Sequence, residues 1–178
     1  VNRRLVMHND FLILGPGHDP AGIEGGGVAA EAFVRIASSR APFVSRGDNS
    51  GTHILEKKLW EKAGITSGGD WHIEAGQGMG ATLMIASEKG AYTLSDRGTY
   101  LAFKRKLDLV PLVKGDPILL NLYHVMEVNP AGFPEVNGTG ARAFSDFMVS
   151  ATAQDIIGAF GTDQFGSALF LPDAAKEE

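Results

Sequence analysis

The sequence predicts an α/β fold, and three observations support this prediction. Apolar segments of strand character alternate along the chain with segments whose apolar residues recur at helical spacing. The 178 residues, 44% of them hydrophobic, are enough for one core of ordinary size. The 23 glycines favour tight turns and close approaches of the backbone to a ligand. No internal repeat, low-complexity tract or linker divides the chain.

The first half of the chain is predicted to begin with a strand at residues 5–14, which Gly15-Pro16-Gly17 ends. The clearest helix spans residues 50–63, and Gly64 follows it as a stop signal. Its apolar face is expected to consist of Ile54, Leu55, Leu59 and Trp60. The other elements of this half are expected to be a helix at 28–39, strands at 41–45 and 71–75, and a helix at 76–87.

The second half continues the alternation. A helix at residues 95–106 is expected to use Ser95 or Asp96 as its N-cap. Strands are expected at 91–94, 107–113 and 122–129, and helices at 138–148 and 152–160. The tail "DAAKEE", residues 173–178, is expected to be solvated.

Composition excludes several classes of function. A net charge of −5 provides no basic surplus for nucleic acid, and no apolar run is long enough to cross a membrane. The chain has no cysteine, so disulfides, thiolate catalysis and cysteine-ligated metals are excluded. Its five histidines are scattered and form no His-x-x-x-His pair. We therefore expect neither a cofactor nor a protein-bound metal ion.

The stretch "SRGDNSGTH", residues 45–53, predicts an anion site. If Ser50 caps the helix that follows, the backbone N–H groups of Gly51, Thr52 and His53 have no partner within that helix. The helix dipole adds partial positive charge at the same place. The Ser50 and Thr52 hydroxyls are further donors, and Arg46 can bring a full positive charge to the same point.

Asp48 is unsuited to contact an anion, so we interpret it as a clamp that fixes Arg46 or caps the loop backbone. The alternative at this stage is structural: Asp48 and Ser50 cap a helix, and Arg46 is a surface charge. A second glycine-rich helix start, "GQGMGA" at 76–81, fits the edge of a ligand cleft or a tight turn. It lacks the Gly-x-Gly-x-x-Gly spacing of a dinucleotide site.

The segment from Arg46 to Thr52, Arg-x-x-x-Ser-Gly-Thr, resembles the anion-binding loop of periplasmic phosphate- and oxyanion-binding proteins. Longer strings resemble the TupA-type tungstate-binding proteins of tungstate ABC importers. These strings are "VNRRLVMHNDFLILGPGHDPAGI", "APFVSRGDNSGTH", "GQGMGATLMIASEKGAYTLSDRGTYLAFK" and "LDLVPLVKGDPILLNLYHVMEVNP". The resemblance covers nearly the whole chain.

This resemblance implies a type II periplasmic-binding-protein-like fold of two α/β lobes that hold an oxyanion in a cleft. It implies that residues 1–9 form the first crossing strand, 10–118 lobe two, and 119–178 the return crossing strand and C-terminal helices that pack on lobe one. The chain begins at Val1, and most of the N-terminal lobe and a signal segment are expected to be missing from it.

The implied ligand contacts are Ser45, Arg46, Ser50, Gly51 and Thr52. Further cleft candidates are Asp48, Gln77, Gly78, Thr93 and Ser95.

The implied function is that of a periplasmic or extracellular solute-binding protein, not an enzyme, that captures tungstate for the permease subunits of an ABC importer. Molybdate, phosphate or sulfate is an alternative ligand, and a ligand-free module of the same fold is an alternative role. A serine hydrolase is a weaker alternative, because "GDNSG" is not the Gly-x-Ser-x-Gly motif.

Overall fold

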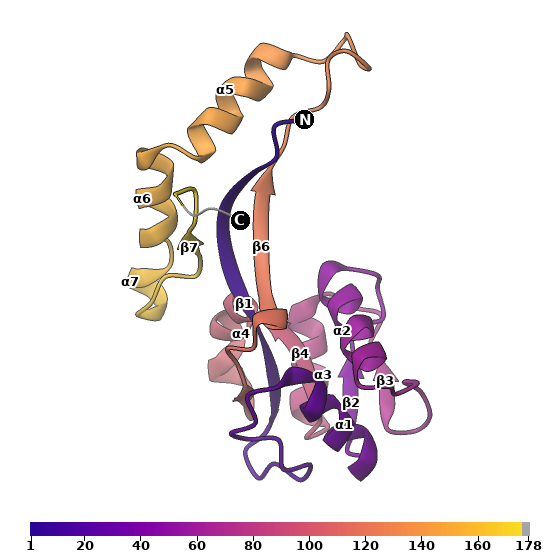
Figure 1. The fold of residues 1–178 in the computed structure, drawn as a ribbon. Coiled ribbons are helices and arrows are strands. Elements are labelled where there is room, and N and C mark those ends of the chain that lie inside the picture. Colours follow the sequence, from indigo (N-terminus) through magenta and orange to yellow (C-terminus); the bar gives the residue numbers. More distant parts are fainter. Residues whose placement is uncertain (176–178) are drawn as a thin grey trace. The chain divides into compact units, whose positions relative to one another are not determined.

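The computed structural model describes residues 1–175. The chain divides into two compact units. The first, here called the α/β unit, is Asp10–Leu120. The second, here called the terminal unit, joins Val1–Asn9 to the described residues from Asn121 onward. Figure 1 shows the elements of both units.

The long strand β1 (Arg4–Pro16) runs through both units. Within the α/β unit it pairs antiparallel with β4 (Thr93–Asp96) and β5 (Leu109–Val113). Ile13 belongs to one hydrophobic cluster and its neighbour Leu14 to another, as expected where successive side chains point to opposite faces of a sheet. Both faces of this sheet are therefore covered.

The strands β2 (Phe43–Ser45) and β3 (His72–Glu74) form a parallel pair. Phe43 also forms a parallel bridge to Tyr92, and the Val44 N–H donates to the Tyr92 carbonyl at 2.8 Å. Since residue 92 leads directly into β4, strand β2 lies between β3 and the start of β4. The carboxyl ends of these parallel segments therefore meet at one edge.

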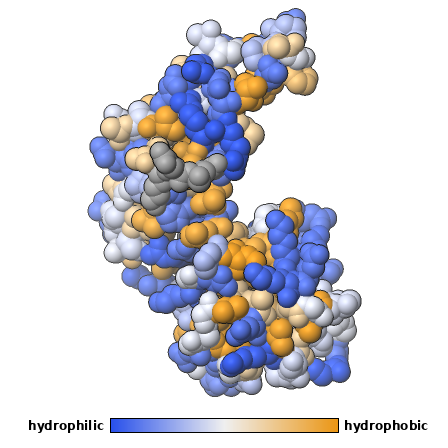
Figure 2. Space-filling model, viewed as in Figure 1, coloured by the Kyte–Doolittle hydropathy of each residue, from blue (hydrophilic) through white to orange (hydrophobic). Residues whose placement is uncertain are grey.

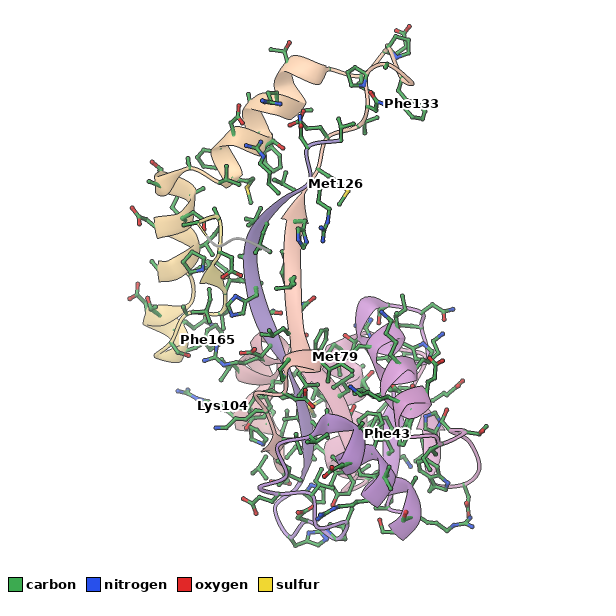
Figure 3. The ribbon with its side chains drawn as sticks, viewed as in Figure 1. Phe43, Met79, Lys104, Met126, Phe133 and Phe165 are labelled. Carbon is green, nitrogen blue, oxygen red and sulfur yellow. The ribbon has the colours of Figure 1, made fainter. Side chains whose placement is uncertain are left out.

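Four helices cover the α/β unit. Helices α1 (Ala29–Ser39) and α2 (Gly51–Lys62) contribute to the first cluster, in which the rings of Phe33 and Trp60 lie 4.2 Å apart. Helices α3 (Met79–Glu88) and α4 (Arg97–Phe103) pack on the second cluster. Figure 3 shows Phe43 among the side chains of this unit. Two short 3₁₀ helices are Lys104–Lys106 and Pro117–Leu119.

The terminal unit pairs the first half of β1 with two strands, β6 (Leu120–Val125) and β7 (Leu171–Pro172). Its helices are α5 (Gly138–Met148), α6 (Ala151–Ala159) and α7 (Thr162–Phe165). Many of its large apolar side chains are exposed, among them Met126, Phe133, Phe144, Phe147, Ile156 and Phe160. Figure 2 shows apolar residues at the surface of this unit, and in Figure 3 Met126 and Phe133 project from its ribbon.

The α/β prediction is confirmed, with corrections to several elements. Ile54, expected in the apolar face of α2, is 47% exposed, whereas Glu56 is buried because its carboxyl group has hydrogen-bond partners. The helix expected at 95–106 ends at Phe103 and starts after Asp96, whose carboxylate accepts from the Thr99 N–H at 2.8 Å. Elements α7 and β7 were not expected from the sequence.

The prediction of a solvated tail was wrong for Asp173, which is only 2% exposed. Its carboxylate lies 2.5 Å from Nδ1 of His8, and its N–H donates to the Val6 carbonyl at 3.0 Å. Asp173 is buried because its side chain has a hydrogen-bond partner, His8, 165 residues away in the sequence. Local polarity predicts that such a residue is exposed. Residues 176–178 of the tail lie outside the described residues.

Candidate functional site

Two helix N-termini lie at the edge where β2 and β3 end. Ser45 and Glu74 are register partners at the carboxyl ends of the two strands, and the Ala75 N–H donates to the Ser45 carbonyl at 2.9 Å. Helix α2 begins six residues after Ser45, and α3 begins five residues after Glu74. The strand pairing therefore places the loops before α2 and α3, which hold the predicted contacts, next to each other.

Ser50 caps α2, as predicted. Its hydroxyl oxygen accepts from the His53 N–H at 3.4 Å. The cap therefore takes the His53 N–H, which was one of the three N–H groups expected to be available to an anion. The N–H groups of Gly51 and Thr52, and the Thr52 hydroxyl, have no hydrogen-bond partner within residues 1–175. These donors at the positive end of the helix dipole can bind an anion.

The loop before α2 is held in one conformation by its own backbone. Gly47 and Asn49 both adopt positive φ, 62° and 58°. At Gly47 a Cβ atom would lie 3.1 Å from Cβ of Glu74, so a side chain would press against β3. The Asn49 N–H donates to Nδ1 of His53 at 3.0 Å, and Lys57 donates to the Asn49 side chain at 2.9 Å. The loop is therefore preorganised.

Arg46 and Asp48 form an ion pair within this loop. The Arg46 Nη2 group donates to one oxygen of Asp48, and the Ser50 N–H donates to the other at 3.0 Å. The prediction that Asp48 is a clamp is thereby confirmed. Desolvation raises the pKa of Asp48, but hydrogen bonds from the side chain and backbone of Ser50, and the bond and charge of Arg46, together lower it to about 2.

The Arg46 guanidinium keeps unused donor capacity. Its side chain is 17% exposed, and its Nε atom is buried without a hydrogen-bond partner in the described part of the chain. A buried donor of a charged group costs free energy when it has no acceptor. An anion with acceptor oxygens would remove this cost.

Ser45 and Gly51 differ in their exposure to solvent. Ser45 is fully buried, and its hydroxyl donates to Oε2 of Glu56 at 2.8 Å while it accepts from the Gly47 N–H at 3.2 Å. At Gly51 an added Cβ would meet no atom within 4 Å, so the backbone there faces open space. Ligand contacts from both residues remain predictions.

The N-terminus of α3 has no side-chain cap. Its N-cap residue Gly78 and the preceding Gln77 are exposed. The carbonyls of both residues accept from the Thr82 hydroxyl, at 3.1 and 3.4 Å. This second helix start therefore presents backbone donors at the same strand edge as α2, although contacts from it remain predictions.

Thr93 and Ser95 are buried on β4. The Thr93 hydroxyl donates to the Val44 carbonyl at 2.8 Å and thereby joins β4 to β2. The Ser95 hydroxyl donates to the Asp96 carbonyl at 3.0 Å. Both hydroxyls are satisfied by protein groups in this conformation, and their role in a cleft also remains a prediction.

Sequence reasoning missed Glu56, which lies directly beneath the loop. Its carboxyl group contacts Ser45, Trp60 and His72. A signal was present, since Glu56 precedes the buried residues Leu59 and Trp60 by three and four positions and so shares their helix face. A glutamate at such a position is buried only with partners, and here Trp60 on α2 is joined by Ser45 from β2 and His72 from β3.

Within residues 1–175, no three side chains of histidine, aspartate or glutamate are grouped so that they could hold a metal ion. In the same part of the chain, every helix is too short or too polar to cross a bilayer.

The fold is that of an α/β domain of the solute-binding class, and the N-terminus of α2 presents N–H donors without partners in the described chain. The profile of the PBP superfamily domain matches residues 1–152. The chain belongs to this superfamily.

Solved and curated relatives narrow this assignment. The chain resembles the solved tungstate-binding protein TupA from Desulfovibrio alaskensis G20 with a TM-score of 0.84 and 44% identity, covering 97% of this chain and 70% of that one. It is 50% identical to a putative ABC transporter anion-binding protein of Haloferax volcanii, over 99% of this chain and 53% of the relative. It is 43% identical to the tungstate-binding protein TupA of Peptoclostridium acidaminophilum, over 99% of this chain and 62% of the relative. The chain thus spans between half and two thirds of the length of these curated relatives.

Proposed function

We propose that this chain is the oxyanion-binding part of an extracytoplasmic solute-binding protein that captures tungstate for an ABC importer. The observation that carries the proposal is the Arg46 guanidinium, whose buried Nε has no partner in the described residues, close in sequence to the free N–H groups of Gly51 and Thr52. A full positive charge, a helix dipole and unused donors in one preorganised loop favour an anion that offers several acceptor oxygens.

The donor set favours a fully deprotonated oxyanion. Tungstate near neutral pH carries two negative charges and no proton, so donors alone can satisfy it. Hydrogen phosphate carries an O–H that needs an acceptor, and the acceptor in this loop, Asp48, already receives hydrogen bonds on both carboxylate oxygens. The loop described here therefore suits tungstate better than hydrogen phosphate.

The preference for tungstate over molybdate is supported by the relatives. Two of the proteins described above are named as tungstate-binding, and a third is named as anion-binding. The two oxyanions have the same charge and nearly the same size, so the donors of this loop treat them alike. Molybdate is accordingly the first competitor to test.

The same proposal assigns the wider roles. Residues 10–118 form a ligand-binding lobe. Residues 1–9 form the first crossing strand to another lobe, and residues 119–178 form the return crossing strand and helices that pack on that other lobe. The protein acts in the periplasm or outside the cell, and its partners are the permease subunits of the importer. It binds its ligand without transforming it, as the names of its relatives as binding proteins support.

A serine hydrolase receives less support from the same loop. The Ser50 hydroxyl accepts from the backbone N–H of His53, and Nδ1 of the His53 ring accepts from the Asn49 N–H. A general base must contact the hydroxyl whose proton it removes. Within residues 1–175 no histidine ring is hydrogen-bonded to the Ser50 hydroxyl, and Nδ1 of His53 is engaged with the loop backbone.

The test is a titration of the ¹⁵N-labelled chain with sodium tungstate, followed by NMR, with calorimetry for the dissociation constant. The amide signals of Gly51 and Thr52 are expected to shift saturably with tungstate. Molybdate, sulfate and phosphate form parallel arms. Equal responses to sulfate and phosphate would make this a general anion site. Unchanged signals with all four anions would overturn the proposal in favour of a ligand-free module.

A further inference from the structure

Glu56 is a buried acidic residue beneath a site that we propose binds an anion. It lies on α2, is 2% exposed, and reaches β2 and β3 through its carboxyl group. An acidic side chain is rarely buried unless its oxygens are hydrogen-bonded. An acidic side chain this close to an anion site does not favour the anion by its charge, so its place there points to a structural or positioning role.

Both carboxyl oxygens of Glu56 accept hydrogen bonds. Oε1 accepts from the indole Nε1–H of Trp60 at 3.1 Å and lies 3.3 Å from Nε2 of His72. Oε2 lies 2.8 Å from the Ser45 hydroxyl oxygen. Because the indole is a donor only, Oε1 must act as an acceptor, and His72 can share it by donating from Nε2.

The direction of the Ser45 hydrogen bond follows from its other partner. The Gly47 N–H donates to the Ser45 hydroxyl oxygen at 3.2 Å, which leaves the hydroxyl proton free to go to Glu56. A directed chain therefore runs from the Gly47 N–H through Ser45 to Glu56. Arg46 lies between Ser45, the last residue of β2, and Gly47, so the chain on both sides of Arg46 is anchored to one carboxyl group.

We propose that Glu56 is a positioning residue for oxyanion binding that acts through Ser45. The inference rests on the proposed function of the loop. Glu56 fixes Ser45 and the positive-φ turn at Gly47, and this turn sets the direction in which Arg46 leaves β2. Affinity improves when the binding conformation is built before the ligand arrives, because less ordering is needed on binding.

The proposal also changes the role of Ser45. Its hydroxyl proton goes to Glu56, and one of its lone pairs accepts from Gly47. Ser45 therefore supports the loop from below, and the anion is bound by Arg46 and the start of α2.

The test is a double-mutant cycle with Glu56→Gln and Ser45→Ala, and with Glu61→Gln as control. Glu61 is an exposed glutamate on the same helix. Glutamine keeps the shape of Glu56, but it must turn an N–H₂ group toward Ser45 if its oxygen is to keep Trp60 and His72. Each of the first two variants is expected to weaken tungstate binding about tenfold, which corresponds to about 1.4 kcal/mol.

The double variant is expected to lose about as much affinity as either single variant, because both changes break the same chain. The control is expected to bind as the wild type does. A second readout is amide hydrogen exchange at Gly47, which is expected to accelerate in Ser45→Ala. Ser45→Ala leaves the contacts of Glu56 with Trp60 and His72 in place, so it still tests the proposal if Glu56→Gln does not fold.

The outcomes separate the two proposals. If the wild type binds tungstate and both variants bind it equally well, with only a lower melting temperature, Glu56 is a structural residue and this inference is overturned alone. Additive losses in the double variant would overturn the route through Ser45. No response of the wild type to tungstate would overturn the proposed function and this inference with it.

Discussion

The α/β unit and the terminal unit differ in how they bury their apolar side chains. Both hydrophobic clusters of the described chain lie within residues 11–119, and their central members Phe33, Phe43 and Leu83 are fully buried. In the terminal unit, Phe133, Phe144, Phe147 and Phe160 are each about half exposed or more. The α/β unit therefore has a core of its own, and this core supports the loop of residues 46–50.

The two units also differ in their buried polar groups. In the terminal unit, side-chain atoms of Arg4, Glu127 and Ser145 are buried without a hydrogen-bond partner in the described chain. In the α/β unit, the buried Ser45 and Glu56 satisfy each other, and the corresponding exception is Nε of Arg46. A buried side-chain donor without a partner in this unit supports our proposal that Arg46 contacts the ligand.

The largest expected effect tests the difference in cores. Phe33→Ala removes a ring that contacts the rings of Phe43 and Trp60, and it is expected to cost about 3–5 kcal/mol of unfolding free energy. Phe147→Ala, at a residue that is 49% exposed, is expected to cost about 0.5 kcal/mol or less. Urea unfolding measures both. Comparable losses of unfolding free energy would show that Phe147 contributes as much to packing in the terminal unit as Phe33 does in the α/β unit.

Arg46→Ala tests whether the α/β unit carries the ligand. It is expected to weaken tungstate binding by about 2–5 kcal/mol, the range for removing one partner of a buried charge interaction. The matched control is Arg40→Ala, since Arg40 is an exposed arginine of the same unit paired with Asp70. Calorimetry gives both affinities. A loss under about 0.5 kcal/mol for Arg46→Ala would remove this residue from the site.

A smaller loss of stability is expected when one helix cap is removed from each unit. Ser50 and Ser150 cap α2 and α6 with similar geometry, accepting backbone N–H groups at 3.4 and 3.3 Å. Each change to alanine is expected to cost about 1 kcal/mol. Both tryptophans, Trp60 and Trp71, lie in the α/β unit, so fluorescence follows that unit. Ser50→Ala is expected to shift the fluorescence transition.

Ser150→Ala is expected to shift the far-ultraviolet circular dichroism transition more than the fluorescence transition. Equal shifts of both signals in both variants would mean that the two units unfold together.

The smallest expected effect is the pH dependence from Asp48. Its pKa is lowered from 3.8 to about 2 in the folded state, so its contribution to stability is present above about pH 4 and is lost as the pH falls through 2. The effect is small because the carboxylate is largely solvated. Asp48→Asn is expected to lose less stability than the wild type between pH 4 and pH 2 in urea titrations. If the unfolding free energies of the two proteins fall in parallel between pH 4 and pH 2, the role of Asp48 as a clamp is contradicted.

Elements with a strong local signal were predictable from the sequence. The apolar run of β1, the helical spacing in α2 and the Ser50 cap each depend on residues within one turn or one strand of each other. The end of β1 was predicted wrongly, because Gly15 and Pro16 still pair with β5 instead of ending the strand. The clamp of Asp48 on Arg46 was predictable for the same reason, since the two residues are neighbours in one loop. Elements α7 and β7, which are four and two residues long, were too short for a periodic signal.

Partners far apart in the sequence were not predictable. Burial of Glu56 depends on His72 from β3 and on Ser45 from β2, and burial of Asp173 depends on His8. Local polarity predicts that such side chains are exposed, because it contains no information about which distant donor reaches them. For the same reason the sequence did not indicate that the Ser45 hydroxyl donates to Glu56.

The sequence alone determined that the chain is an α/β protein without cysteine or basic surplus, and that residues 45–53 are rich in donors around a helix start. These properties depend on composition and on short-range spacing, which folding does not alter. The tertiary structure decided which donors remain free. Burial and long-range hydrogen bonds assign the Ser45 hydroxyl and the His53 N–H to the protein itself, and leave Nε of Arg46 and the first N–H groups of α2 without partners in the described chain.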